Sequence, residues 1–294
     1  MSDIQGISIL IPIFNFDIRP LIEKLSKEAE YISIPVEIRC YDDLSTKEFK
    51  GLHQNISKNP LIFYQELPEN IGRSQIRNKL AKEAKYSTLL FLDSDSTVVV
   101  DHFLRNYIAA YKTNSVVAGG TAYAEDKNPL YSLRYLYGKR REEIPAEKRK
   151  SKPYSYLNLN NLFLPKDIYL ENQLDESIKT YGHEDTKFAE SLRKKNVSVI
   201  HIDNPVLHSG LETNQAFLLK SQEAVKNFHK IIQEGYGHHT RLFKYYTLIN
   251  KPFLKSLFLF FYKRIEKNIE KNLLSDNPSL FYFDLFKLKL LLQQ

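Results

Sequence analysis

The strongest constraint on the fold is an alternation of short apolar runs with helix-like segments over residues 7–92. The strand-like runs are ISILIPIF (7–14), PVEIRCY (35–41), LIFYQEL (61–67) and STLLFL (87–92). Between them, the segments 18–32 and 73–85 place apolar residues at helical spacing. This βαβαβ order is typical of a mostly parallel sheet with helices on both faces, where ligands bind at the carboxyl ends of the strands. We therefore predict an α/β fold with its functional site at that edge.

Size and composition favour a globular protein without disulfides. The chain has 294 residues, of which 43% are hydrophobic, and Cys40 is its single cysteine. The first residues carry no basic region, and Pro12 interrupts their apolar run, so we expect neither a signal peptide nor an anchor there. The late apolar run LFLFFY (257–262) is far shorter than the ~20 residues of a spanning helix. We expect a cytoplasmic protein, placed at the inner face of the cell membrane.

The positive charge is concentrated near the C-terminus. Residues 236–294 contain ten Lys or Arg and four Asp or Glu, which accounts for +6 of the total charge of +7. In KPFLKSLFLFFYKRIEK (251–267) the cations alternate with Phe, Leu and Tyr, as in helices that lie on anionic membranes. The alternative is that these helices pack their apolar face on the main domain. We divide the chain into a domain at 1–212 and a basic, amphipathic helical extension at 213–294, and predict contact with an anionic membrane through 236–294.

Polar residues follow three of the predicted strands. They are Asn15, the pair Asp42 and Asp43, and the triplet Asp93, Ser94 and Asp95. Neighbouring carboxylates repel unless a cation compensates them, and carboxylate oxygens suit Mg²⁺ or Mn²⁺ bound together with phosphates. The alternative for the triplet is a simple Asx turn.

The second half of the chain offers a candidate proton acceptor. In YGHEDTKFAESLRKKN (181–196), Glu184 and Asp185 open a predicted helix, where they could act as a base or only favour the helix dipole. The following segment 197–210 is predicted as one strand that ends near His208. The charge-dense stretch 138–152 is predicted as a solvated, mobile loop and a candidate lid.

Five motifs together carry a family resemblance. ISILIPIFN, YDDLS, NIGRSQIRN, FLDSDS and YGHED lie in this order, and the similarity extends over residues 7–208. The chain resembles the bacterial inverting glycosyltransferases of family 2, which use nucleotide-diphosphate sugars. The resemblance implies a GT-A fold, which is a Rossmann-like, mixed but mostly parallel central sheet flanked by helices, here with a C-terminal helical extension.

The resemblance also implies a role for each matching residue. The donor-binding residues would be Pro12, Asn15, Asp42, Asp43, Arg73, Arg77, Asp93 and Ser94. The metal, Mn²⁺ or Mg²⁺, would be held by Asp95, Asp93 and His208, although His208 could instead bond the diphosphate or pack in its loop. Asp185 would be the catalytic base, and the acceptor would contact Glu184, Asn160 and Asn161.

The expected activity is therefore metal-dependent, inverting transfer of a sugar, from a UDP-sugar, to a hydroxyl of a glycan or lipid-linked saccharide in surface polysaccharide synthesis. Two alternatives remain open at this point. A sugar-phosphate nucleotidyltransferase would share the sheet and the metal carboxylates, but the first strand is not followed by a glycine-rich loop. A basic nucleic-acid-binding protein would explain the pI of about 9.1, but it gives no role to the triplet Asp93-Ser94-Asp95, the D-x-D motif of this chain. We expect no nucleic-acid partner.

Overall fold

The computed structural model describes residues 4–294. Its strands form two sheets, of seven and three strands. The strands are β1 (Ile7–Ile13), β2 (Val36–Asp42), β3 (Ile62–Glu66), β4 (Thr88–Phe91), β5 (Ser96–Val98), β6 (Ser115–Ala118), β7 (Thr121–Ala122), β8 (Leu162–Pro165), β9 (Ser198–His201) and β10 (Val206–His208).

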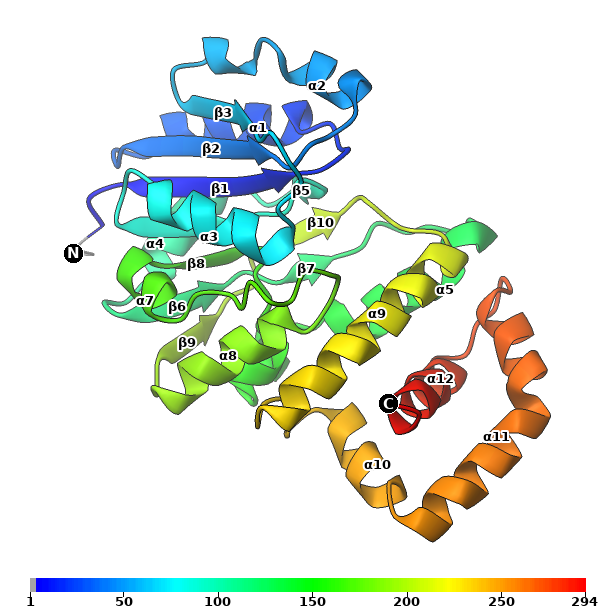
Figure 1. Cartoon of the computed structure of the whole chain (residues 1–294). Helices are drawn as coiled ribbons and strands as arrows, with labels where there is room; N and C mark the ends of the chain where they lie inside the picture. The colour runs from blue at the N-terminus through cyan, green and yellow to red at the C-terminus, as the bar shows by residue number, and fades with distance from the viewer. Residues whose placement is uncertain (1–3) are drawn as a thin grey trace.

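The large sheet has the order β3-β2-β1-β4-β8-β6-β9 (Figure 1). Only β8 runs antiparallel to its neighbours β4 and β6. The neighbours β2, β1 and β4 are parallel, so their carboxyl ends lie along one edge. This confirms the predicted mixed, mostly parallel sheet and the edge at which its polar residues gather.

Helices cover both faces of this sheet and form the C-terminal region. They are α1 (Arg19–Glu30), α2 (Lys47–His53), α3 (Arg73–Glu83), α4 (Phe103–Ala110), α5 (Ser132–Tyr137), α6 (Ala146–Lys150), α7 (Lys166–Glu171), α8 (Glu184–Lys194), α9 (Asn214–Gln233), α10 (Arg241–Ile249), α11 (Pro252–Leu273) and α12 (Leu280–Leu292). Short 3₁₀ turns lie at Ile56–Lys58, Pro129–Tyr131 and Pro153–Tyr156, and a π-helical turn lies at Gly138–Glu142.

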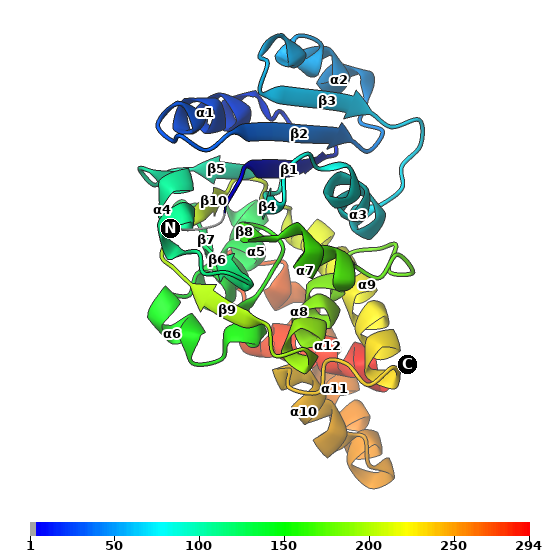
Figure 2. The same ribbon diagram turned by 90° about the vertical axis from the view of Figure 1, so that its left-hand side faces the viewer.

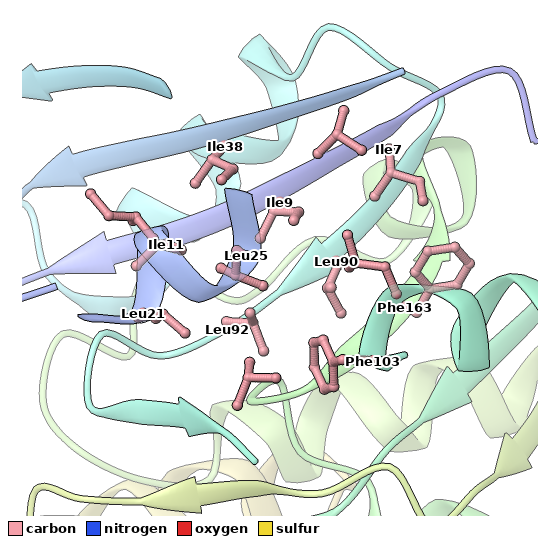
Figure 3. Close-up of a cluster of buried hydrophobic side chains, with 14 of the residues drawn as sticks. Ile7, Ile9, Ile11, Leu21, Leu25, Ile38, Leu90, Leu92, Phe103 and Phe163 are labelled. Atoms are coloured by element: carbon pink, nitrogen blue, oxygen red, sulfur yellow. The ribbon is translucent and has the colours of Figure 1, made fainter. Parts of the chain in front are cut away.

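The two faces of the sheet are buried in separate cores. On one face, Ile9 and Ile11 of β1 pack with Leu25 of α1 and Phe103 of α4 (Figure 3). On the other face, Leu10 packs with residues of α3, α7 and α8. Because β1 is buried on both faces, its sequence is a continuous apolar run rather than an alternating one.

Two sequence predictions are wrong in detail. Residues 197–210 form two strands, β9 in the large sheet and β10 in the small sheet, because the segment at Asp203 and Asn204 turns between them. The stretch 138–152 is not a solvated loop, since it contains the π-helical turn and α6. Arg149 anchors it, since its buried guanidinium donates to the carbonyls of Ala118, Gly119 and Ile202 and contacts His201 Nδ1 at 2.7 Å.

The C-terminal helices share cores with the rest of the chain. Leu133 of α5 packs with Phe217 of α9, Tyr262 of α11 and Phe283 of α12. Figure 2 shows α2 and β3 at one end of the molecule and α10 at the other. Within residues 4–294, no helix is both long enough and apolar enough to span a bilayer.

Candidate active site

The loops after β1 and β2 meet at the edge of the sheet. The N–H of Asp43 donates to Ile13 O at 2.8 Å, and the Asp43 carboxylate accepts from the N–H groups of Ile71 (2.7 Å) and Gly72 (3.0 Å) at the start of α3. Burial raises the pKa of Asp43, and these two hydrogen bonds oppose the rise. Asp43 therefore fixes the turn that leads into α3.

Asp42 and Asn15 hold the adjacent loop. Asp42 is fully buried and accepts from Ser45 N–H at 2.6 Å and from the Tyr64 hydroxyl at 3.3 Å. Asn15 adopts a left-handed backbone conformation, and its side-chain oxygen accepts from Thr46 N–H at 2.8 Å. Pro12 lies near the carboxyl end of β1, where it is partly buried and pairs with Tyr41 of β2.

Helix α3 links the D-x-D turn to the start of α8. Arg77, which is 4% exposed, forms an ion pair with Asp93, and the Arg73 Nε donates to Glu184 Oε1 at 3.0 Å. The four-residue spacing places both arginines on one face of the helix, as the sequence indicated. Burial works to raise the pKa of Asp93, but the charges of Arg77 and Arg73 outweigh it and hold the pKa below its usual value.

The second aspartate of the D-x-D faces β10. Asp95 Oδ2 lies 3.5 Å from His208 Nδ1, and its backbone carbonyl accepts from Ser209 N–H at 2.8 Å. Burial raises the pKa of Asp95, although His208 opposes the rise. A Cβ on Gly210 would lie 2.7 Å from Asp95 Oδ2, so a larger residue at this position would displace the Asp95 side chain. Ser94, between the two aspartates, is partly exposed.

Residues 159–161 connect the two halves of the site. Leu159 N–H donates to Asp185 Oδ1 at 3.1 Å, and Asn160 Oδ1 accepts from Asp93 N–H at 3.1 Å and from Ser96 Oγ at 2.9 Å. Asn161 is 1% exposed, and its amide nitrogen donates to the carbonyls of Gly120 and Asn204 at 2.8 Å each. These contacts favour a structural role for both asparagines, and their predicted contact with the acceptor stays a prediction.

The start of α8 carries two carboxylates in different surroundings. Gly182 and His183 both have positive φ, which turns the chain sharply into the helix. Burial works to raise the pKa of Glu184, but Arg73 and Arg77 outweigh it and lower that pKa. Burial and the neighbouring Glu184 charge raise the pKa of Asp185 to about 7. Within residues 4–294, Glu184 Oε2 is a buried atom without a hydrogen-bond partner, and Asp185 Oδ2 accepts no hydrogen bond.

A buried ionic network behind His208 has no signal in the sequence. The Tyr123 ring lies 5.6 Å from the His208 ring between centroids, and the Arg134 guanidinium donates to the Tyr123 hydroxyl at 2.8 Å. Arg134 also pairs with Glu142 at 3.1 Å and with Glu212 at 3.3 Å. Because its partners are separated by up to 78 positions from Arg134 in the chain, no local pattern identifies it. The network holds β10 and the residues after it in place.

The donor atoms at this edge suit a divalent ion that is bound jointly with a phosphate. No three His, Cys, Asp or Glu side chains in the described part of the chain gather closely enough to hold a metal by themselves. Asp95 and His208 provide one carboxylate and one imidazole nitrogen, while Asp93 is engaged by Arg77. Mg²⁺ in nucleotide sites is commonly bound by one or two carboxylates plus substrate phosphates. Asp95 and His208 therefore fit such an ion, with Asp93 beside it.

Comparison with known proteins assigns the family. A family model described as Glycosyl transferase family 2 matches residues 8–168, which is more than half of the chain. The chain belongs to this family. The match includes β1 to β4, the D-x-D and residues 159–161, and it ends before Asp185 and His208. No curated protein sequence matches the chain.

Solved structures share the GT-A fold. A mannosyltransferase, PcManGT from Pyrobaculum calidifontis, in complex with GDP-Man and Mn²⁺, superposes with a TM-score of 0.55 at 16% identity, covering 79% of this chain and 65% of that one. TarS from S. aureus superposes with a TM-score of 0.50 at 18% identity, covering 74% of this chain and 38% of that one. The chain thus covers less than two thirds of each of these proteins, and at such identities the likeness establishes the fold.

Proposed function

We propose that the protein is a metal-dependent inverting glycosyltransferase, which moves a sugar from a nucleotide-diphosphate sugar to a hydroxyl of a glycan or lipid-linked saccharide. The observation that carries this proposal is the pair of links made by α3, Arg77 to Asp93 and Arg73 to Glu184. They bring the D-x-D turn and the start of α8 to the two sides of one site. Membership of family 2 favours sugar transfer over transfer of a nucleotidyl group.

The donor occupies the edge of β2, β1 and β4 in this proposal. The nucleoside lies against the loops held by Asn15, Asp42 and Asp43, with Pro12 and Ser94 beside it. Asp95 and His208 would hold Mn²⁺ or Mg²⁺, which would supply positive charge to the departing diphosphate. Arg73 adds a cationic group on the same side. GDP-Man and Mn²⁺ in the complex of PcManGT support a donor and a metal of this class. UDP as the carrier stays a prediction.

Asp185 is the proposed base. The acceptor hydroxyl oxygen forms a bond with the anomeric carbon while the bond from that carbon to the diphosphate oxygen breaks, and Asp185 Oδ2 takes the hydroxyl proton. A base with a pKa near the working pH is the most effective, and Asp185 has a pKa of about 7. Glu184 Oε2, which is buried without a partner among residues 4–294, accepts a hydrogen bond from a further hydroxyl of the substrate.

The acceptor class rests on a proposed membrane surface. This α11 surface consists of Phe253, Leu257, Phe260, Phe261 and Ile265, whose exposed fractions are 76%, 40%, 54%, 57% and 39%. The spacing of these residues places them on one side of the helix. An apolar groove of about 310 Å³ adjoins them between α10 and α11.

Cations flank the α11 surface, so an anionic bilayer is the occupant that fits it. Lys251, Lys263, Arg264 and Lys267 are exposed on the same helix or at its start. Aromatic and aliphatic side chains beside lysine and arginine are typical of helices that lie in the interface of an anionic membrane. We therefore place the enzyme at the cytoplasmic face of the cell membrane, where lipid-linked saccharide acceptors and a role in surface polysaccharide synthesis would follow.

Nucleotide release from a panel of UDP-, GDP- and other nucleotide-sugars, with and without Mn²⁺, tests the activity. We expect Mn²⁺-dependent release from one donor and its loss in Asp95→Ala. The variant Asp185→Asn should keep its affinity for donor and metal but lose transfer by about 100-fold or more. Failure of every donor to bind, or a Asp185→Asn variant with most of its turnover, would contradict the proposal.

A further inference from the structure

A large cavity lies between α8 and the C-terminal helices α10 and α12. Its volume is about 680 Å³, and its walls come from residues 137–157, α8, α10 with the turn before it, and α12. Figure 2 shows α8, α12 and α10 following one another below the large sheet. Clefts of this size are typical of sites for small organic ligands. Two of the four walls belong to the C-terminal extension.

The cavity adjoins the proposed base. Thr186, the residue after Asp185, lines it, and so does Leu157, two residues before the Leu159 N–H that bonds Asp185. The lining residues of α8 run from Thr186 to Glu190, so the cavity follows α8 for about one helical turn. The cavity therefore begins one residue along α8 from Asp185, and the Asp185 carboxylate itself is not part of its lining.

The walls carry an excess of positive charge. Six Lys or Arg side chains line the cavity, against the two acids Glu190 and Asp284. Asp284 is already used, because it pairs with Arg141 at 2.8 Å and with Lys287 at 3.3 Å. Glu190 pairs with Arg193 at 3.1 Å and with His239 at 3.4 Å. Both acids of the cavity already form ion pairs, so neither neutralises the remaining Lys and Arg side chains that line it.

Four of the cations are exposed and have no acidic partner within residues 4–294. They are Arg140, Lys148, Lys152 and Arg241, and they come from the π-helical turn, α6, the segment after it and α10. Cations of one sign in a cleft raise the local concentration of an anion. Burial lowers the pKa of Lys287, and Arg141 and Arg241 lower it further, while Asp284 opposes the change. A bound anion would relieve this repulsion.

Aromatic rings lie among the cations. Tyr154, Tyr156, Tyr245 and Phe281 line the same cavity. Flat rings offer apolar faces to a sugar or a prenyl chain, while the cations suit phosphate oxygens. The combination fits a ligand that joins an organic group to a phosphate, rather than a free inorganic anion or a neutral sugar.

We infer that this cavity binds the phosphate-bearing part of the acceptor, so that the acceptor is an anionic, phosphorylated saccharide. The inference rests on the proposed function, since it takes the ligand of the cavity to be one part of the acceptor whose hydroxyl reaches Asp185. It also gives the C-terminal extension a second role, because α10 and α12 complete the acceptor site. The phosphate could belong to a lipid diphosphate or to a phosphodiester between repeating units, and both offer the same chemistry to the four cations.

Binding experiments with two soluble probes distinguish these sources. Citronellyl diphosphate represents the lipid diphosphate, glycerophosphoglycerol represents the phosphodiester, and maltose is the neutral control. Titrations are carried out by calorimetry in EDTA, which removes metal-dependent binding at the donor site. We expect one anionic probe to bind, at least tenfold more weakly in 0.5 M salt than in 0.05 M, and maltose to bind far less.

The test variant carries Arg140→Gln, Lys148→Gln, Lys152→Gln and Arg241→Gln, and we expect it to lose at least tenfold in affinity for the probe. The matched control carries Lys58→Gln, Lys82→Gln, Lys112→Gln and Lys230→Gln, which removes four exposed cations outside the cavity and should bind as the native chain does. Equal affinity in the native chain and the test variant, or no binding of either anionic probe, would overturn the inference. Binding of UDP or GDP with Mn²⁺ to the native chain is measured in parallel. If the native chain binds neither nucleotide, that result counts against the proposed function and not against this inference.

Discussion

Two adjacent residues, Glu184 and Asp185, differ in their protonation because different groups surround them. Glu184 bonds the Arg73 guanidinium, and the arginines lower its pKa in spite of its burial. Asp185 has only the Leu159 N–H as a hydrogen-bond donor among the described residues, and burial beside the Glu184 charge raises its pKa to about 7. One carboxylate is thus a fixed negative charge that can bind a hydroxyl, and the other can take up a proton near neutral pH.

The rate of transfer should depend on pH through Asp185. A base acts in its deprotonated form, so kcat/KM should fall about tenfold for each pH unit below 7 and reach a plateau above it. The measurement is kcat/KM between pH 5 and 9 at saturating Mn²⁺. A profile that is flat from pH 5 to 9 would contradict the assignment of Asp185 as the base.

The thermal stability of Asp185→Asn provides an independent check. Because the folded-state pKa of Asp185 lies above the ordinary value of 3.8, the fold prefers the protonated form. The stabilisation of the native chain by protonated Asp185 is complete below about pH 4 and is lost as the pH rises through 7. The Tm of Asp185→Asn should therefore exceed that of the native chain by several degrees at pH 8, and by much less at pH 5.

Gly210 should control the position of Asp95. In Gly210→Ala the new Cβ would lie 2.7 Å from Asp95 Oδ2 and 2.9 Å from Asp95 Cβ, so the Asp95 side chain must shift from its present position. We expect the Mn²⁺ concentration for half-maximal activity to rise about tenfold, with an unchanged circular dichroism spectrum. Gly51→Ala in α2 is the control, because its Cβ would meet no atom within 4 Å and alanine stabilises a helix by about 0.5–1 kcal/mol. An unchanged Mn²⁺ requirement in Gly210→Ala would show that the Asp95 position is not important for the metal.

At the scale of elements, residues 159–161, which directly precede β8, connect the parts of the site. Asn160 holds the D-x-D turn, Leu159 holds Asp185, and the N–H of Asn161 donates to Phe91 O of β4 at 2.9 Å. The asparagine pair was predicted to contact the acceptor, but both side chains bond protein groups. Asn161 has a positive φ of 65°, which asparagine tolerates better than most residues.

Substitution of the two asparagines should separate stability from activity. Asn161→Ala leaves the carbonyls of Gly120 and Asn204 without this donor in a buried region and should cost about 2–4 kcal/mol of unfolding free energy. Asn160→Ala releases the Asp93 N–H and should reduce kcat at least tenfold with a smaller loss of stability. Urea unfolding and donor turnover measure the two effects. Similar stability in both variants would contradict the structural role of Asn161.

The sequence predicts an element well when local residues determine it, and poorly when its contacts come from distant parts of the chain. The strands β1 to β4 and the helices α1, α3 and α8 follow local hydrophobic patterns, and their bounds agree with the prediction to within a few residues. Helix α6 was missed because Arg149 is held by carbonyls that lie 30 to 53 positions away. The pairing of Asp95 with His208 was predicted only through the family resemblance, since no local pattern brings positions so distant together.

At the scale of the whole molecule, the C-terminal extension and the family 2 region are one packed unit. Tyr137 of α5 contacts the rings of Phe217 and Phe283, at 5.4 and 5.6 Å between centroids, and α12 walls the cavity beside α8. Truncation at residue 236 would therefore remove part of the shared core. A test of the proposed membrane surface must change exposed side chains and leave this core intact.

The triple variant Phe253→Ser, Phe260→Ser and Phe261→Ser tests the membrane contact of the α11 surface. These rings are 76%, 54% and 57% exposed, so their loss should change the stability by less than about 1 kcal/mol. Burial of such rings in a bilayer contributes about 1.5–3 kcal/mol each, so we expect at least a hundredfold loss of binding to vesicles that contain 30% anionic lipid.

Co-sedimentation with these vesicles measures the binding, and the control is Tyr31→Ser with Leu130→Ser, two exposed apolar residues at 66% and 61% that lie outside the α11 surface. Binding of the native chain should weaken in 0.5 M salt, because the cations beside the rings contribute. Both variants should bind nucleotide diphosphate with Mn²⁺ as the native chain does, since neither change touches the sheet edge. If the triple variant binds vesicles as strongly as the native chain, the exposed face of α11 does not contact the membrane, and the proposal for this surface is wrong.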